Sequence, residues 1–416
     1  MKYGLIGEKL SHSFSKEIHE ALTDYTYEIR ELTPDEVAPF LAAREFEGIN
    51  VTIPYKEKVI PHLDEISDAA RLMGAVNTIK KVDGRLIGDN TDFYGMSEMI
   101  RRAGISLEGK KVLILGTGGT SKTSRAVASA MGAREIVIVS RTASSSTVTY
   151  EEAVTSHSDA EIIINTTPVG MYPNTDAAPI DIGRFPNLSG VIDAIYNPLR
   201  TRLILAAEKR GIPATGGLMM LILQAARAAE IFLGKKLDGE NVEKVAKSIF
   251  ESKENIVLIG MPGCGKSTIG KALSDATGRP LIDTDTVIEE MTGKHPADII
   301  RESGEDAFRD IETQATREVS KRSGIIIATG GGIVKRSENI PLLHQNGKII
   351  YLNCPVDELP VTPDRPLSSS RAAIEKLFLT RNLLYTLAAN ATVNVSHKNP
   401  PETTANEILK IFTELI

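Results

Sequence analysis

The chain has 416 residues, of which 42% are hydrophobic, 25% charged and 5% aromatic. This composition is that of a folded protein and excludes disordered, collagen-like and fibrous classes. Because single hydrophobic cores stop growing at about 250–300 residues, the length predicts two or three domains. Lys and Arg number 48 against 54 Asp and Glu, a net charge of −6. We therefore expect no nucleic-acid partner, since proteins that bind nucleic acids usually carry an excess of positive charge.

Cysteine usage and hydropathy bear on the compartment. The two cysteines, Cys264 and Cys354, are too few for a disulfide framework and indicate a reducing environment. The N-terminus lacks the apolar stretch of a signal peptide, and no run of about 18 apolar residues occurs. We expect a cytoplasmic protein that does not span a membrane, either a monomer or a homodimer.

The first hundred residues alternate apolar runs with helical patterns. Runs at 2–6, 26–30 and 48–53 predict strands. Four polar clusters follow apolar runs, where loops usually hold ligands. They are Ser11-His-Ser13-Phe-Ser15, Asn50-Val-Thr52-Ile-Pro-Tyr-Lys56, Gly74-Ala-Val-Asn77-Thr78 and Gly88-Asp-Asn90-Thr-Asp92. The pattern predicts a substrate-binding α/β lobe over residues 1–100, for a ligand with several polar groups.

A nucleotide-binding pattern begins at Lys110, with the sequence KKVLILGTGGTSKTSRAVASAM. An apolar strand, a glycine-rich turn and a helix in this order bring backbone N–H groups close to a pyrophosphate. Short apolar runs at 135–139, 161–164 and 191–195 then alternate with helical stretches, as in a doubly wound parallel sheet. Residues 101–217 are thus predicted to form a Rossmann-like lobe.

The end of the second strand of this lobe predicts the cofactor. An NAD site carries an acidic residue there, whereas this chain has Ser140-Arg141-Thr142. Arg141 favours a 2′-phosphate and hence NADP. The residues expected to bind the cofactor are Gly116, Gly118, Gly119, Thr120, Ser140, Arg141, Thr142 and Gly217.

The main domain boundary is expected between Phe250 and Ile256. A helical pattern over about 218–250 completes the first lobe, and the polar stretch ESKEN then precedes a new apolar strand. This stretch predicts a short linker, followed by a second α/β domain over residues 251–416.

This second domain opens with a complete phosphate-binding motif. Gly260-Met-Pro-Gly-Cys-Gly265-Lys266-Ser267-Thr268 fits G-x-x-x-x-G-K-S/T behind an apolar strand. In this motif backbone N–H groups surround the phosphates, the lysine reaches the β/γ oxygens and the serine hydroxyl binds Mg²⁺. The motif predicts an ATP site formed by Gly263, Cys264, Gly265, Lys266, Ser267 and Thr268.

Further motifs follow in order. Leu281-Ile-Asp283-Thr-Asp285 is expected to end a strand with both carboxylates on one face, because residues two apart in a strand point the same way. The others are Phe308-Arg309-Asp310-Ile311-Glu312, Thr329-Gly330-Gly331-Gly332, Asp364-Arg365-Pro366-Leu367 and Arg381-Asn-Leu-Leu-Tyr385. Each is weak alone, and Arg309 or Arg381 alone reads equally well as a surface helix charge.

Taken together, these motifs resemble shikimate kinase from about Asn255 to the C-terminus. The resemblance implies a P-loop kinase with a parallel sheet, in which planar guanidinium groups bind the ring carboxylate. It assigns Mg²⁺ to Ser267 and Asp283, catalysis to Lys266, Asp285 and Arg365, and substrate binding to Asp285, Arg309, Gly330, Gly331, Gly332 and Arg381.

The four polar clusters of the first lobe resemble shikimate dehydrogenase over residues 1 to about 250. The resemblance includes Asn165-Thr-Thr-Pro-Val-Gly170-Met, Asp193-Ala-Ile-Tyr196-Asn-Pro and Gln224. Reduction of a ring ketone needs a positioned acid–base pair beside the carbonyl oxygen, and Lys56 and Asp92 are the expected pair. The expected substrate-binding residues are Ser13, Ser15, Thr52, Asn77, Tyr196 and Gln224.

The two resemblances imply one bifunctional enzyme. Its first part would reduce 3-dehydroshikimate to shikimate with NADPH, and its second would phosphorylate shikimate with MgATP. Two alternatives stay open: an NAD-linked quinate/shikimate dehydrogenase for the first part, and another small-metabolite kinase or a degenerate regulatory P-loop module for the second. Arg309 and Arg381 discriminate among kinases, because a ring carboxylate requires them.

Overall fold

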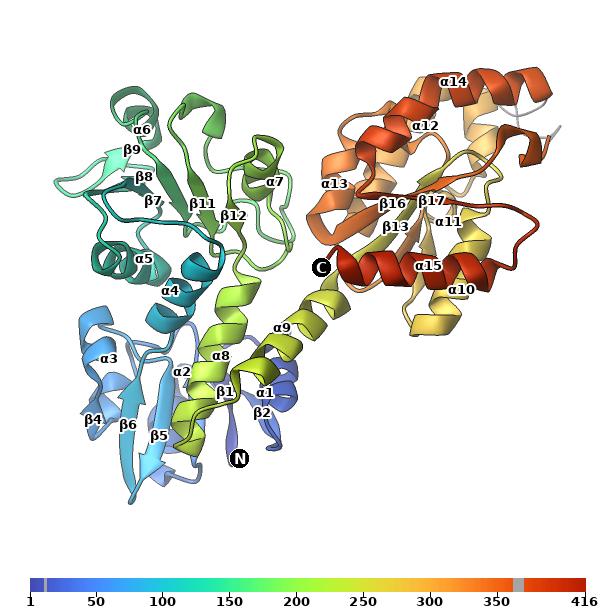
Figure 1. The fold of residues 1–416 in the computed structure, drawn as a ribbon. Coiled ribbons are helices and arrows are strands. Elements are labelled where there is room, and N and C mark those ends of the chain that lie inside the picture. The colour runs from blue at the N-terminus through green and yellow to red at the C-terminus, as the bar shows by residue number, and fades with distance from the viewer. Residues whose placement is uncertain (11–12, 362–369) are drawn as a thin grey trace. The chain divides into compact units, whose positions relative to one another are not determined.

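The computed structural model describes residues 1–10, 13–361 and 370–416. The chain divides into two compact units (Figure 1): the first comprises residues 1–197 and 201–249, the second residues 198–200 and 250–416. Within the described ranges, no helix combines the length and apolarity needed to cross a membrane.

The first unit contains two sheets. The N-terminal one has the strand order β2-β1-β3-β5-β6-β4, with β5 antiparallel to its neighbours β3 and β6. Its strands are β1 (Tyr3–Gly7), β2 (Tyr27–Glu31), β3 (Gly48–Val51), β4 (Glu65–Ile66), β5 (Thr78–Val82) and β6 (Arg85–Asp89). The β5–β6 hairpin turns at Asp83 and Gly84, both at positive φ, as a two-residue hairpin turn requires.

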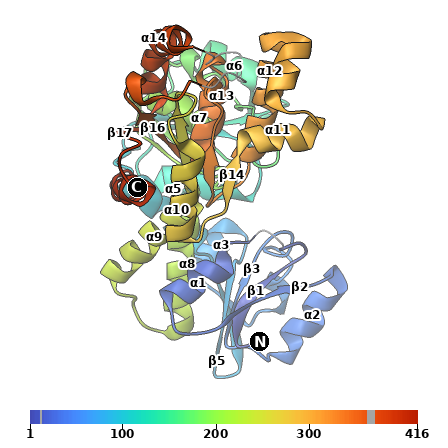
Figure 2. The ribbon, with the colours of Figure 1, turned by 90° about the vertical axis from the view of Figure 1, so that its right-hand side faces the viewer.

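Helices cover this first sheet. They are α1 (Ser15–Leu22), α2 (Pro34–Ala43), the 3₁₀ turn η1 (Ile60–His62), α3 (Asp68–Met73), α4 (Asp92–Arg102) and α8 (Leu218–Leu233). The apolar residues 218–223 form the N-terminal part of α8, which packs against α1 (Figure 2) and against α4. α8 therefore returns to the N-terminal lobe after the chain has built the second sheet.

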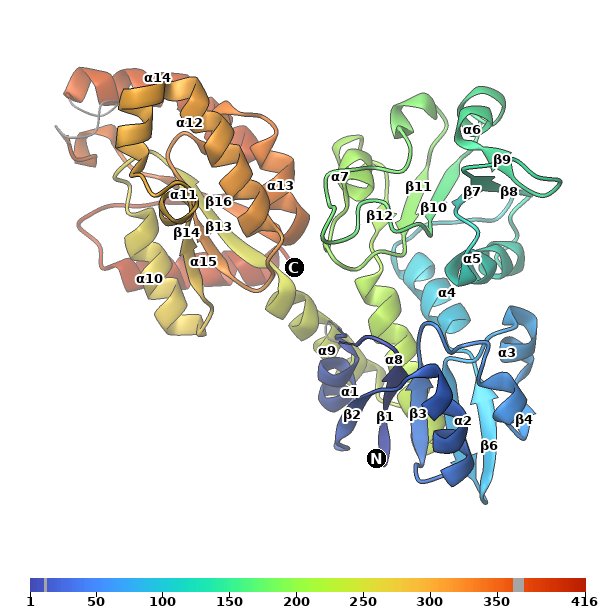
Figure 3. The same ribbon diagram turned by 180° about the vertical axis from the view of Figure 1, so that it is seen from behind.

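The second sheet is entirely parallel, in the order β12-β11-β10-β7-β8-β9 (Figure 3). The strands β7, β10 and β11 are buried along their whole length, which is why they read as continuous apolar runs. The strands are β7 (Lys111–Leu115), β8 (Glu135–Ser140), β9 (Val148–Thr149), β10 (Ile162–Asn165), β11 (Gly190–Asp193) and β12 (Ala214–Thr215). The helices are α5 (Gly119–Ala130), α6 (Tyr150–Ser156), η2 (Ile182–Arg184) and α7 (Arg202–Lys209).

The expected linker is helical. α9 (Gly239–Lys253) includes the polar residues after Phe250, and β13 begins at Asn255. The buried face of α9 ends at Ile249, so the apolar periodicity stops one turn before the helix does. Glu, Ser and Lys are compatible with helix, so the polar stretch continues α9 to Lys253 rather than forming a loop.

The second unit is a five-stranded parallel sheet in the order β14-β15-β13-β16-β17. Its strands are β13 (Asn255–Gly260), β14 (Leu281–Asp283), β15 (Ile326–Ala328), β16 (Gly347–Asn353) and β17 (Ala391–Asn394). Its helices are α10 (Lys266–Thr277), α11 (Thr284–Thr292), α12 (Pro296–Ser320, kinked at Gly304), η3 (Ile333–Lys335), α13 (Asn339–Asn346), η4 (Val356–Glu358), α14 (Arg371–Ala388) and α15 (Pro401–Glu414). The predicted α/β class is confirmed for both units.

One local prediction in this unit is wrong. β14 ends at Asp283, and Asp285 lies in the first turn of α11 rather than on the strand. Asp283 caps this helix, its Oδ1 accepting a hydrogen bond from the backbone N–H of Asp285 at 3.0 Å. The two carboxylates still line one cavity.

Candidate active sites

The first unit contains a cavity of about 520 Å³. Every residue predicted for substrate binding or acid–base chemistry lines it: Ser13, Ser15, Thr52, Lys56, Asn77, Asp92, Tyr196 and Gln224. Apolar side chains of Met220 and Leu221 from α8 complete the wall. The sequence clusters lie far apart along the chain, and the fold of the first unit brings them to one cavity.

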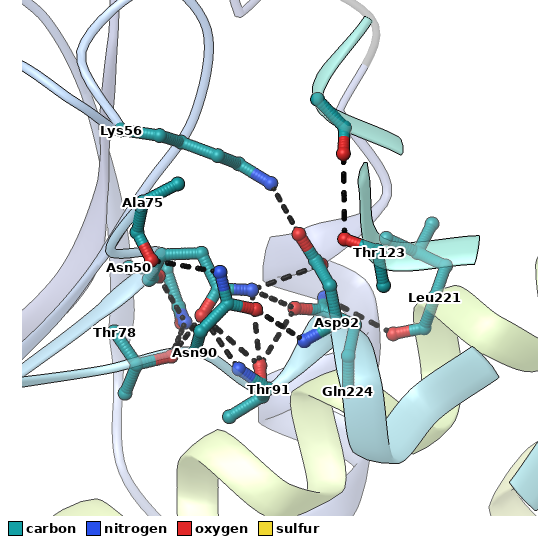
Figure 4. A network of polar contacts seen from close by, with 12 residues as sticks. Asn50, Lys56, Ala75, Thr78, Asn90, Thr91, Asp92, Thr123, Leu221 and Gln224 are labelled. Atoms are coloured by element: carbon teal, nitrogen blue, oxygen red, sulfur yellow. Dashed lines mark hydrogen bonds and ion pairs between the residues drawn. The ribbon is translucent and has the colours of Figure 1, made fainter. Parts of the chain in front are cut away.

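Lys56 and Asp92 form an ion pair in this cavity. The Lys56 Nζ lies 2.7 Å from Asp92 Oδ2, and their side chains are 29% and 18% exposed (Figure 4). Asp92 is the first residue of α4, where the helix dipole favours a carboxylate. Its backbone N–H donates to Asn90 Oδ1 at 3.0 Å. Asp92 is thus fixed at a helix N-terminus, and both members of the pair line the cavity.

Asn77 connects the pair to the substrate-binding residues. Its Nδ2 donates to Asp92 Oδ1 at 2.9 Å and to Thr91 Oγ1 at 3.1 Å. Thr91 Oγ1 in turn donates to Gln224 Oε1 at 3.2 Å. Figure 4 shows Thr91, Asp92 and Gln224 converging from α4 and α8. The Lys56–Asp92 pair and the polar cavity wall therefore form one hydrogen-bonded network.

The glycine-rich turn after β7 leaves room for a dinucleotide. Gly116 has φ 107°, and a Cβ there would lie 2.8 Å from Thr166 Oγ1, so only glycine fits. Gly118 and Gly119, at the N-terminus of α5, have no heavy atom within 4 Å of a built Cβ. Backbone N–H groups at an open helix N-terminus suit a pyrophosphate. Thr120 and Gly217 continue this surface into the substrate cavity.

Arg141, which the sequence predicts to bind the 2′-phosphate of NADP, lies at the end of the second strand of this lobe. It follows Ser140, the last residue of β8, and its guanidinium is exposed. The following turn is closed by hydroxyl groups, with Thr147 Oγ1 donating to the backbone carbonyl of Thr142 at 3.2 Å. Lys122, a further cation near the turn, lies 3.1 Å from the Glu57 carboxylate. Arg141 thus has the exposure that recognition of a 2′-phosphate requires, whereas Lys122 is engaged elsewhere.

In the second unit, the phosphate-binding loop between β13 and α10 borders a cavity of about 660 Å³. Gly260, Gly263 and Gly265 all have positive φ, so the motif's glycines are required by the backbone. Lys266 is buried, and its Nζ donates to the carbonyls of Gly260 and Met261, each at 2.9 Å. The six predicted ATP-binding residues, Gly263, Cys264, Gly265, Lys266, Ser267 and Thr268, all line this cavity.

A hydroxyl and a carboxylate lie together at its edge. Ser267 Oγ donates to Asp283 Oδ2 at 2.7 Å. Oxygen donors of this kind are the ligands that Mg²⁺ prefers, and that ion usually keeps several waters besides one or two protein ligands. The pair therefore fits a Mg²⁺ ion bound with nucleotide phosphates.

A second pocket, of about 130 Å³, adjoins the nucleotide cavity. Arg309 and Arg381, 3% and 4% exposed, line it, and this burial rules out their reading as surface charges. Arg309 donates to Glu312 at 2.7 Å and Glu305 at 3.0 Å, while Arg381 Nη1 donates to the Gly331 carbonyl at 2.8 Å. The other predicted residues on this wall are Asp285, Gly330, Gly331 and Gly332.

Some lining residues were not predicted. Glu312 was noted only within a motif, yet it faces Arg309, and burial raises the pKa of its carboxyl while the guanidinium opposes that shift. His295 borders both pockets, and Ser396 and His397 reach the nucleotide cavity from the segment after β17. Nothing local in the sequence marks these three, because only the fold places them there. Arg365 lies outside the described residues.

A Rossmann lobe beside a polar cavity with a Lys–Asp pair defines a dinucleotide-dependent oxidoreductase, and the second unit is a P-loop phosphotransferase. Residues 5–79 match the family model for the shikimate dehydrogenase substrate binding domain, and residues 262–413 match that for shikimate kinase. The NADP(+)-dependent shikimate dehydrogenase of Clostridium perfringens strain 13 is 36% identical over 264 residues, spanning 59% of this chain and 97% of that protein. The chain belongs to the shikimate dehydrogenase family and carries a shikimate kinase domain after it.

Solved structures agree with this assignment. Shikimate 5-dehydrogenase from Thermus thermophilus, in complex with NADP(H) and shikimate, is similar with a TM-score of 0.54 and 30% identity, covering 60% of this chain and 99% of that one. A chorismate mutase/shikimate 5-dehydrogenase fusion protein from Clostridium acetobutylicum has a TM-score of 0.56 and 33% identity, covering 60% of this chain and 97% of that one. Fusion of this dehydrogenase to a second enzyme therefore has a parallel among its relatives.

Proposed function

We propose that the first unit reduces 3-dehydroshikimate to shikimate, with Lys56 and Asp92 as its acid–base pair. The 2.7 Å ion pair inside a polar cavity beside the cofactor turn carries this proposal. NADPH, bound along Gly116–Thr120 with its 2′-phosphate at Arg141, supplies the hydride. The Lys56 ammonium donates a proton to the carbonyl oxygen, and Asp92 keeps that ammonium charged and directed into the cavity.

The remaining cavity residues bind and orient the substrate. Hydroxyl groups of Ser13, Ser15 and Thr52 donate to the substrate carboxylate, while the Asn77 and Gln224 amides contact its ring hydroxyls. The phenol of Tyr196 covers the edge of the ring, and burial raises its pKa, so it stays neutral. A set of neutral donors beside one ammonium suits a polyhydroxylated acid and disfavours an apolar ketone.

The second unit phosphorylates the shikimate hydroxyl. MgATP, held by Gly263–Thr268 with the ion at Ser267 and Asp283, supplies the phosphoryl group. Asp285, shared by both pockets, accepts hydrogen bonds from ring hydroxyls beside that group, while Lys266 neutralises phosphate charge. Arg309 and Arg381 bind the ring carboxylate. Their burial in this pocket favours a substrate with a ring carboxylate over the substrates of other small-metabolite kinases. The intact phosphate-binding loop argues against a purely regulatory module.

The state of the cysteines and the net charge agree with the compartment and the partners that we infer for both reactions. Cys264 and Cys354 are both free and buried, in keeping with a reducing cytoplasm. The partners we infer are small anionic metabolites rather than nucleic acid, since the net charge is −6. The cationic groups that bind these metabolites are concentrated at the sites themselves, at Lys56, Arg141, Lys266, Arg309 and Arg381.

A coupled assay tests the whole proposal. The purified chain, given 3-dehydroshikimate, NADPH and MgATP, is expected to produce shikimate 3-phosphate. Failure to form this product with all three present would sink the joint function. Replacing NADPH by NADH, and 3-dehydroshikimate by the corresponding quinate precursor, gives four kinetic comparisons. A preference for NADH would reverse the role given to Arg141.

Two lysine variants separate the two sites. Lys56→Ala is expected to lower ketone reduction at least about a hundredfold, because it removes the proton donor, and to leave phosphorylation intact. Lys266→Ala should do the opposite. Matched controls are Lys58→Ala, close to Lys56 in the same segment, and Lys271→Ala on α10, which pairs only with Asp275 at 2.8 Å among the described residues. Loss of both activities in Lys266→Ala would instead favour a regulatory phosphate-loop unit.

A further inference from the structure

A fully buried tyrosine lies behind the dehydrogenase cavity and belongs to none of the sequence motifs. Tyr27 begins β2, and its ring stacks on the imidazole of His19 with centroids 4.1 Å apart and planes at 6°. Burial lowers the pKa of His19 to about 3, so this imidazole is neutral. The stacked pair is therefore uncharged. The Tyr27 hydroxyl extends from this pair toward Asn50 in the cavity wall.

The direction of the hydrogen bond from this hydroxyl is fixed by chemistry. Asn50, which lines the cavity, points its Nδ2 at the backbone carbonyl of Asn77 at 3.1 Å. A carbonyl only accepts, so the other end of the Asn50 amide, Oδ1, must face Tyr27. The Tyr27 hydroxyl lies 2.7 Å from that oxygen and donates to it. Asn50 thus has both ends satisfied in a buried position.

Asn50 in turn fixes the Asn77 carboxamide. Its Nδ2 also lies 3.1 Å from Thr78 Oγ1, which donates to Asn77 Oδ1 at 2.9 Å (Figure 4). The backbone N–H of Thr91 donates to the same Oδ1 at 2.9 Å. With its oxygen held by two donors, Asn77 must present its N–H₂ to Asp92 Oδ1. A continuous chain of oriented hydrogen bonds therefore runs from Tyr27 to the acid–base pair.

We propose that Tyr27, acting through Asn50, is a positioning residue of the dehydrogenase. It holds the carboxamide of Asn77 in the orientation that places Asp92 against Lys56. This inference rests on the proposed role of that pair. Without the hydroxyl, Asn50 Oδ1 loses its donor at 2.7 Å, and rotation of the Asn50 amide releases both of its contacts to Asn77 and Thr78. Small displacements of a catalytic pair lower the rate of the chemical step more than they weaken binding.

Tyr27→Phe tests the proposal, with Tyr25→Phe as its matched control. The Tyr25 hydroxyl contacts His19 Nδ1 at 2.7 Å and belongs to the same aromatic cluster, but it does not reach Asn50. Tyr27→Phe is expected to lower kcat for 3-dehydroshikimate reduction about tenfold. KM for NADPH and the rate of shikimate phosphorylation should stay at wild-type values, and Tyr25→Phe should keep the wild-type kcat. A Tyr27→Phe variant with unchanged kcat and only a lower unfolding temperature would overturn the proposal.

A double-variant cycle tests whether Asn50 carries the effect. Asn50→Ala alone is expected to lower kcat at least as much as Tyr27→Phe, and adding Tyr27→Phe to it should change kcat no further. If the two substitutions lowered kcat independently, so that their effects multiplied in the double variant, the inference would be contradicted. Failure of this inference is distinguishable from failure of the proposed function. Full reductase activity in Lys56→Ala would discard the acid–base pair, whatever the effect of Tyr27→Phe on kcat.

Discussion

Asp193 is a completely buried carboxylate at the end of β11 in the Rossmann-like lobe. It accepts hydrogen bonds from Asn165 Nδ2 at 3.0 Å, from the Ile195 backbone N–H at 3.0 Å and from Thr201 Oγ1 at 2.7 Å. Burial nevertheless outweighs these donors and raises the pKa of Asp193 from 3.8 to about 6. The folded state therefore binds a proton at this site more tightly than the unfolded state does.

This raised pKa predicts a pH-dependent stability. Between pH 3.8 and about 6, the folded chain holds a proton on Asp193 that the unfolded chain has lost, so stability falls as pH rises through this window. The accumulated effect is about 3 kcal/mol, at 1.36 kcal/mol per pH unit. Asp193→Asn removes this slope, and its unfolding free energy relative to wild type should rise by most of that amount between pH 4 and 7, measured by denaturant titration.

Asp159 provides a control of opposite sign. The Lys111 ammonium beside it lowers the pKa of this exposed carboxyl, so its contribution is present above the unfolded pKa and is lost only as pH falls below about 4. Asp159→Asn should therefore show a constant difference from wild type between pH 5 and 7. A similar slope in both variants would mean that Asp193 is not the titrating group.

At the scale of elements, the segment after β15 approaches α12 so closely that side chains are excluded. A Cβ at Gly332 would overlap the guanidinium of Arg309. Gly332→Ala is therefore expected to displace this guanidinium from the ring pocket and raise the kinase KM for shikimate about 10- to 100-fold, the value of one or two charge-assisted hydrogen bonds. The affinity for ATP, measured by calorimetric titration, should not change, because the phosphate loop is untouched.

Gly239 offers the matched control. It begins α9, and a Cβ there meets no heavy atom within 4 Å. Gly239→Ala should therefore leave both activities at wild-type level. An unchanged KM for shikimate in Gly332→Ala would contradict the placement of Arg309 against the substrate.

The elements also show which parts of the structure are predictable. The motif residues around Lys56 and Lys266 are recognisable because their chemistry requires fixed local spacings, and each set lines one cavity. The two-residue spacing of Asp283 and Asp285 predicts a strand for both residues. This spacing does not reveal that Asp283 caps a helix. No motif includes Tyr27, because its hydroxyl contacts a residue 23 positions away in the sequence, on a strand that β1 separates from β2, and no local pattern encodes this strand order.

At the scale of the whole molecule, two units with separate hydrophobic cores and separate ligands should unfold in two transitions. The core of the second unit is built around β13 and β16, whereas the first unit has its own clusters around β3 and β7. A ligand that binds one folded unit stabilises that unit by about 2.7 kcal/mol at a hundred times its dissociation constant. NADP⁺ is therefore expected to raise only one transition in differential scanning calorimetry, and MgATP only the other.

The variants defined above assign each transition. Lys266→Ala should abolish the MgATP-induced shift and preserve the NADP⁺-induced one, because Lys266 belongs to the phosphate-binding loop of the second unit. Arg141→Ala should reduce the NADP⁺-induced shift toward that given by NAD⁺, since it removes the cation facing the 2′-phosphate. A single transition raised by either ligand would show that the units unfold together. The chain crosses from the first unit to the second within α9, between Ile249 and Phe250.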